Sequence, residues 1–125
     1  RVGLLETMPA SDPVMLESEL RTLFEAHPEV AQLAFALGNL FASQRRWSDA
    51  QQSYYDALLA AKAGGAELIS PDYAFNLAVS LERLNQLRPA YTFYRQALEQ
   101  SQSVAPGFDI RVLRERLDAL ERVLP

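Results

Sequence analysis

The sequence contains no cysteine and a single histidine, His27, among its 125 residues. Without cysteine the chain can form neither a disulfide nor a thiolate nucleophile, and this absence suits the cytoplasm and an oxidising compartment equally well. A single histidine cannot build a Cys–His pair or a histidine-rich metal site. His27 precedes a proline, so we interpret it as a capping or surface residue. We therefore expect a protein that is not an enzyme and that holds no metal or cofactor.

Long apolar runs and an excess of positive charge are lacking too. No run approaches the roughly 18 apolar residues that would span a bilayer, so we expect no membrane insertion. The formal net charge is -4 and the pI is about 5.0. A chain with this charge does not attract nucleic acid or anionic lipid, both of which are negatively charged. The expected partner is another protein or a peptide, and neither nucleic acid nor a small-molecule substrate.

The start of the sequence lacks both a methionine and a signal-peptide pattern. Arg1 is its first residue, and no basic, apolar and small segments follow in that order. We expect a fragment of a longer protein, and the compartment stays open between cytoplasm and periplasm. At this length, with 49% hydrophobic residues, the fragment can bury one compact core.

Almost every stretch repeats its apolar residues at steps of three and four, which predicts an all-α domain of about six helices. Gly64 and Gly65 can adopt the positive φ that ends a helix, here the third. Capping residues and prolines mark the expected starts, which are Ser11 and Asp12 before Pro13, Pro28, Ser48, Ser70 before Pro71, and Asp109. The fifth helix is expected to follow Leu87, with Pro89 near its first turn.

One pattern of residues occurs twice in the sequence, forty residues apart. Residues 34–61 read AFALGNLFASQRRWSDAQQSYYDALLAA, and residues 74–101 read AFNLAVSLERLNQLRPAYTFYRQALEQS. A unit of two helices cannot cover its own apolar face, so copies of it stack side by side. The paired positions agree in size or character, and they are Ala34 and Ala74, Leu37 and Leu77, Gly38 and Ala78, Phe41 and Leu81, Trp47 and Leu87, Ala50 and Ala90, Tyr54 and Tyr94, and Ala57 and Ala97.

This pattern resembles the tetratricopeptide repeat family, whose units of about 34 residues are helix pairs. Residues 31–64, with an extension to 70, and residues 71–104 match its spacing, although Ala34 and Ala74 replace the usual tryptophan and neither unit ends in proline. Residues 1–12 form a leading segment, residues 13–28 look like a degenerate half repeat, and residues 105–125 look like a capping helix. The resemblance implies a right-handed α-solenoid of antiparallel helix pairs.

In this family the first helices line the concave groove where ligands bind. A helical projection at 100° per residue places one set of side chains opposite each core stripe. The first helix contributes Gln32, Phe35, Asn39, Ala42 and Ser43, and the second unit contributes Asp72, Phe75, Val79, Glu82 and Arg83, with Asn76 at the edge.

By resemblance, the peptide-binding groove is formed by nine of these residues, which are Gln32, Phe35, Asn39, Ser43, Asp72, Phe75, Asn76, Val79 and Arg83. Asn39 and Asn76 look like the asparagines that hold a ligand's backbone in peptide-binding members, because an amide both donates and accepts. Phe35 replaces the lysine that grips a C-terminal carboxylate elsewhere in the family, so we expect an apolar or aromatic-bearing ligand. A second interpretation stays open, in which Phe35 and Phe75 only pack against the neighbouring first helix.

The last helix carries several arginines that could form a basic patch. These arginines are Arg111, Arg114, Arg116 and Arg122. Spacings of four predict instead a solvated face that is neutralised on its own helix, with Arg111 facing Glu115, Arg114 facing Asp118, and Asp118 facing Arg122.

The expected function is a non-catalytic protein-interaction module. By resemblance it belongs to a larger, membrane-anchored bacterial assembly protein of the pilus, secretion or envelope type. The alternative is a structural or oligomerisation domain that forms a homo-oligomer through its repeat surfaces. Uncovered apolar side chains at Met15, Leu16 and Leu23 would favour that alternative.

Overall fold

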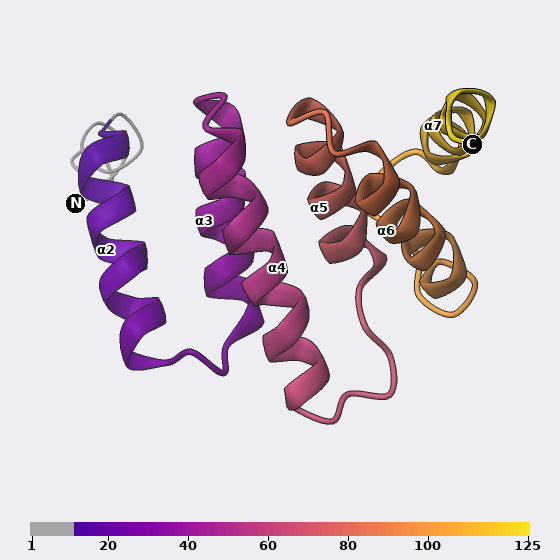
Figure 1. Cartoon of the computed structure of the whole chain (residues 1–125). Coiled ribbons are helices and arrows are strands. Elements are labelled where there is room, and N and C mark those ends of the chain that lie inside the picture. Colours follow the sequence, from indigo (N-terminus) through magenta and orange to yellow (C-terminus); the bar gives the residue numbers. More distant parts are fainter. Residues whose placement is uncertain (1–11) are drawn as a thin grey trace.

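The structure, a computed structural model, describes residues 12–125. These residues form six α-helices and no strand, as expected, and the helices are α2 (Pro13–Ala26), α3 (Ala31–Ser43), α4 (Trp47–Ala63), α5 (Pro71–Arg83), α6 (Leu87–Gln100) and α7 (Ile110–Val123). Each helix packs on the next in chain order, so the array extends from α2 at one end to α7 at the other (Figure 1). None of these helices is both long and apolar enough to cross a bilayer. The expected cap Ser11 lies outside the described residues.

Three helices begin at the caps that the sequence predicts. The Asp12 carboxylate accepts the Met15 amide at 3.1 Å, and the Ser70 hydroxyl accepts the Asp72 amide at 3.2 Å. The Asp109 carboxylate accepts the Arg111 amide at 2.9 Å. Each bond satisfies an amide that has no partner inside its own helix.

Two predicted starts are wrong. Helix α3 begins at Ala31 rather than Pro28, because the Val30 amide bonds to the His27 carbonyl at 3.1 Å and closes a turn first. Helix α4 begins one residue before Ser48, at Trp47, and no side chain caps it. In both places a backbone turn fixes the start.

The turn between paired helices is the same in both units. Arg45 and Asn85, forty residues apart, have φ of 58° and 62°. The amide of the next residue then bonds back to the preceding helix at 2.9 Å in each unit, Arg46 to Phe41 and Gln86 to Leu81. Asparagine adopts this left-handed conformation readily, whereas arginine does so at a cost.

Burial also repeats at forty residues. The two tyrosines at matching places, Tyr54 and Tyr94, are only 2% and 1% exposed. The matched small residues Gly38 and Ala78 are buried as well, and Gly38 approaches the Tyr54 ring so closely that a Cβ there would overlap it. Six matched alanines are fully buried between the helices, and they are Ala34, Ala74, Ala50, Ala90, Ala57 and Ala97.

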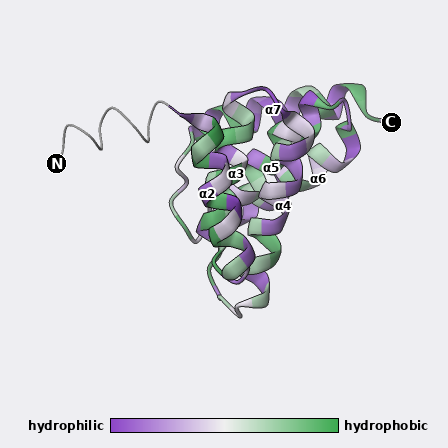
Figure 2. Cartoon of the chain, turned by 90° about the vertical axis from the view of Figure 1, so that its left-hand side faces the viewer, coloured by the Kyte–Doolittle hydropathy of each residue, from purple (hydrophilic) through white to green (hydrophobic). Residues whose placement is uncertain are grey.

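The two ends of the array differ in how well they are covered. On α7, Leu113, Leu117 and Leu120 are buried, as the apolar stripe predicts. Helix α2 buries no residue fully, and only Leu20 and Phe24 pack partly against the core. Met15, Leu16 and Leu23 remain 46%, 38% and 47% exposed. Figure 2 views the molecule from the α2 side, where hydrophobic segments appear in green among the helices that face the reader.

Candidate binding cleft

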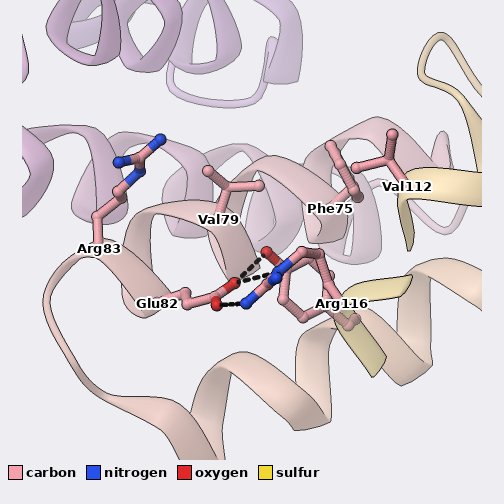
Figure 3. A pocket seen from close by; sticks show the side chains of 7 residues that line it. Phe75, Val79, Glu82, Arg83, Val112 and Arg116 are labelled. Atoms are coloured by element: carbon pink, nitrogen blue, oxygen red, sulfur yellow. Dashed lines mark hydrogen bonds and ion pairs between the residues drawn. The ribbon is translucent and has the colours of Figure 1, made fainter. Parts of the chain in front are cut away.

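A cleft of about 600 Å³ lies where α5, α6 and α7 meet (Figure 3). Helix α5 supplies most of its lining, because residues four apart lie on one face of a helix. Three residues of the predicted groove, Phe75, Val79 and Arg83, lie together in it. The other lining residues are Glu82, Tyr94, Val112 and Arg116.

The apolar side of the cleft is built around Phe75. The Phe75 ring is stacked on Phe108, with centroids 4.0 Å apart and planes 8° from parallel, and it meets the Tyr94 ring edge-on at 5.8 Å. Val79 and Val112 complete this side, from α5 and α7 respectively. Phe75 is therefore held by packing on two aromatic neighbours and still borders the cleft.

A carboxylate with two partners forms the polar wall. Glu82 Oε1 accepts hydrogen bonds from the Tyr94 hydroxyl at 2.8 Å and from Arg116 Nε at 3.1 Å, while Glu82 Oε2 pairs with Arg116 Nη2. Burial raises the pKa of Tyr94, and its bond to the carboxylate raises it further. The hydrogen bond to Glu82 raises the pKa of Arg116. Glu82 and Arg116 thus neutralise each other and join α5 to α7.

Arg83 lies at the opposite side of the cleft and has a different environment. Its Cζ atom is 5.4 Å from the centre of the Trp47 ring, close enough for a cation–π contact. Within residues 12–125 it forms no ion pair. Figure 3 shows its guanidinium pointing away from Glu82 and Arg116. A positive charge therefore stands at the rim beside the apolar wall.

Phe35 occupies in the first unit the place that Phe75 has in the second. Its ring lies 5.6 Å from Tyr54 of its own unit and 5.1 Å from Tyr73 at the start of α5. Each phenylalanine thus contacts the tyrosine of its own unit and an aromatic residue of the segment that follows. This is the geometry expected of the packing interpretation, and a groove role for Phe35 remains a prediction.

The two asparagines are already hydrogen-bonded within the chain. The exposed Asn39 accepts the Tyr54 hydroxyl at 2.7 Å, and burial raises the pKa of that tyrosine to about 12. Asn76 donates to the Asp72 carbonyl of its own helix at 2.9 Å. The Asp72 carboxylate accepts the Gly107 amide at 2.8 Å and so holds the segment before α7. A ligand would have to share these amides with the protein.

The remaining predicted groove residues lie away from the cleft. Gln32 is exposed and borders a smaller hollow beside the segment 64–70. Ser43 is exposed, and its hydroxyl donates to the Leu40 carbonyl of its own helix at 2.6 Å. The structure therefore brings together Phe75, Val79 and Arg83 of α5. It leaves Asp72 and Asn76 of the same helix, and the predicted residues of α3, outside the cleft lining.

The charge pattern predicted for α7 is wrong. None of the three expected pairs on α7 is an ion pair among the described residues. Arg111 bonds instead to the cap Asp109, with 3.0 Å between Nη2 and Oδ2, because the cap carboxylate already lies at the helix start. Arg116 was assigned to a solvated face, yet it reaches Glu82 on another helix, 34 residues away in sequence.

The described residues contain no group of three or more His, Asp or Glu side chains placed to hold a metal ion. A comparison with models of known protein families found no match, and no curated protein matches the chain significantly. The tetratricopeptide assignment therefore stays a resemblance that rests on the paired residues.

Proposed function

We propose that this chain is a non-catalytic protein-interaction module with a tetratricopeptide-like, right-handed arrangement of helix pairs. It binds an extended segment of a partner protein in the cleft between α5 and α7. One observation carries the proposal, which is that three residues chosen for the groove, Phe75, Val79 and Arg83, line the same hollow. By the resemblance, the module would serve a larger bacterial assembly protein.

The composition of the cleft favours binding over chemistry. Aromatic residues and arginine are the side chains that contribute most at protein interfaces, and both kinds line it. Its one carboxylate, Glu82, is occupied by the Tyr94 hydroxyl and by Arg116. A general base needs an acceptor within reach of its substrate, and both oxygens of Glu82 already accept hydrogen bonds within the chain.

The proposal is tested by selecting ligands from a displayed library of random peptides and mapping their contacts on the 15N-labelled chain by NMR. The blocking variant is Val112→Glu, which places a charge in the cleft at an exposed position of α7. The matched control is Val123→Glu, which is exposed on the same helix and outside the cleft lining.

Selected peptides should shift the amide signals of the cleft residues. They should bind the control like the unmodified chain and the blocking variant about tenfold or more weakly, a loss typical of an interface centre. Equal binding to both variants, or shifts confined to α2 or to the outer face of α7, would show that the cleft is not the binding site.

A second candidate function is self-association through α2. The observation that favours it is the exposure of Met15, Leu16 and Leu23, together with Val14, which is 78% exposed. Adjacent exposed apolar side chains commonly mark an interaction surface. Sedimentation should then show a concentration-dependent oligomer that Leu16→Glu with Leu23→Glu converts to a monomer. A monomer at every concentration of the unmodified chain would exclude this function.

A further inference from the structure

Helix α5 presents three successive side chains to the cleft, one per turn. Phe75, Val79 and Arg83 are four residues apart, and a helix rises about 6 Å over four residues. Side chains on one side of an extended chain repeat about every 7 Å, because alternate residues face the same way. An extended segment lying along α5 would therefore set every second side chain against one of these three residues.

The charges of the cleft differ in their availability. Glu82 and Arg116 satisfy each other, whereas Arg83 has no ion-pair partner in the part of the chain that the structure describes. The rim of the cleft is therefore positive although the whole chain carries a net charge of -4. A carboxylate is the protein group that complements a free guanidinium best.

Trp47 restricts where that guanidinium can lie. The Arg83 Cζ atom lies over the Trp47 ring, 5.4 Å from the ring centre, and a cation–π contact of this kind leaves the N–H groups available for hydrogen bonds. An arginine that is already positioned loses less freedom when it binds, so each hydrogen bond to a ligand contributes more. Trp47 is thus a positioning residue for Arg83.

Resting on the proposed function, we infer that the cleft selects a partner segment in which an acidic side chain lies two residues from an apolar one. The apolar side chain contacts Phe75 and Val79, and Arg83 binds the carboxylate through its N–H fork. The selectivity arises from the spacing of α5 and from the unneutralised charge at its C-terminal end.

The test uses three blocked peptides in a glycine frame. The first contains Glu-Ser-Leu-Ser-Glu, the second contains Gln-Ser-Leu-Ser-Gln, and the third contains Glu-Ser-Ala-Ser-Glu. Each sequence reads the same in both directions, so the orientation of the bound segment need not be known. The first peptide should shift the NMR signals of Phe75, Val79 and Arg83, and it should bind about tenfold more tightly than the second. The third should bind several-fold more weakly than the first, since it has lost the apolar contact.

Variants of the chain test whether Arg83 and Trp47 cause the preference for glutamate over glutamine. Arg83→Gln should bind the first two peptides equally, and Arg83→Lys should keep part of the preference because it retains the charge without the fork. Trp47→Leu, which introduces the residue found at the matching Leu87, should reduce the preference without abolishing it. Arg114→Gln, on the exposed face of α7, should behave like the unmodified chain.

The failures of the inference and of the proposed function are distinguishable. Equal binding of the first two peptides in the cleft overturns the inference and leaves the function standing. Shifts from none of the three peptides also overturn the inference, and library-selected peptides then decide the function. If Arg83→Gln keeps the preference for glutamate, another residue binds the glutamate carboxylate and the assignment to Arg83 is wrong.

Discussion

The ring of Tyr54 lies directly over Gly38, and a Cβ added to Gly38 would stand 2.6 Å from the ring atoms Cδ1 and Cε1. Alanine ordinarily stabilises a helix by about 1 kcal/mol relative to glycine. Here we expect Gly38→Ala to lower the free energy of unfolding instead, by about 1 kcal/mol, because the buried Tyr54 must move. Gly38→Leu and Ala78→Leu should lose about 1 to 3 kcal/mol each. Urea unfolding measures all three, and a stabilised Gly38→Ala variant would contradict the close approach.

The left-handed turn at Arg45 offers a stabilising substitution. Arg45 is exposed with φ of 58°, a conformation that costs an ordinary residue about 1 to 2 kcal/mol and glycine almost nothing. Arg45→Gly should raise the free energy of unfolding by about 1 kcal/mol in thermal or urea unfolding. Asn85→Ala, at the same place in the second unit, should lower it. A neutral or destabilising Arg45→Gly would mean that the arginine side chain contributes more than its backbone costs.

Tyr54 predicts a loss of stability at high pH. Burial raises its pKa from 10.0 to about 12, so the unfolded chain ionises this phenol at a lower pH than the folded chain does. The stabilising contribution of the neutral form is complete below pH 10 and is lost as the pH rises through 12. The free energy of unfolding should therefore fall over this interval, and less steeply in Tyr54→Phe.

Glu17 predicts the opposite dependence at low pH. The hydrogen bond from Arg46 is the largest cause that lowers its pKa, and the one from Arg21 is the next. The Glu17 to Arg46 contact at 2.8 Å joins α2 to the start of α4. The contribution of this carboxylate is present above its ordinary pKa of 4.5 and is lost as the pH falls below it. Hydrogen exchange should show α2 opening before the other helices on acidification. Glu17→Gln should open α2 at neutral pH, whereas the exposed Glu19→Gln should not.

Local features of the sequence were sufficient to predict the six helices and the buried faces of the two repeated pairs. The spacing of Ala34, Leu37 and Phe41, and its repetition forty residues later, reports which side of each helix is apolar. The starts at Pro28 and Ser48 failed because capping preferences are weak compared with the backbone turns that precede α3 and α4. A turn closed by backbone hydrogen bonds can form with many residue types, so the sequence does not predict it.

The cleft could be predicted only in part, for a physical reason. Phe75, Val79 and Arg83 share a helix, so their common face follows from 100° per residue alone. Phe108 and Arg116 come from later segments, and their positions depend on how α7 packs against α5 and α6. The spacing of apolar residues predicts which face each helix buries. It does not predict how that helix is positioned along a helix elsewhere in the chain. Spacing within α7 therefore misassigned Arg116.

The contact between Trp47 and Arg83 also has a practical consequence. Trp47 is the only tryptophan of the chain, so the indole emission of the whole molecule originates one side chain away from the cleft. A ligand that draws the guanidinium off the ring would alter the intensity and wavelength of that emission. The protein thus carries an intrinsic fluorescent reporter of occupancy at Arg83, and binding can be followed without attaching a dye.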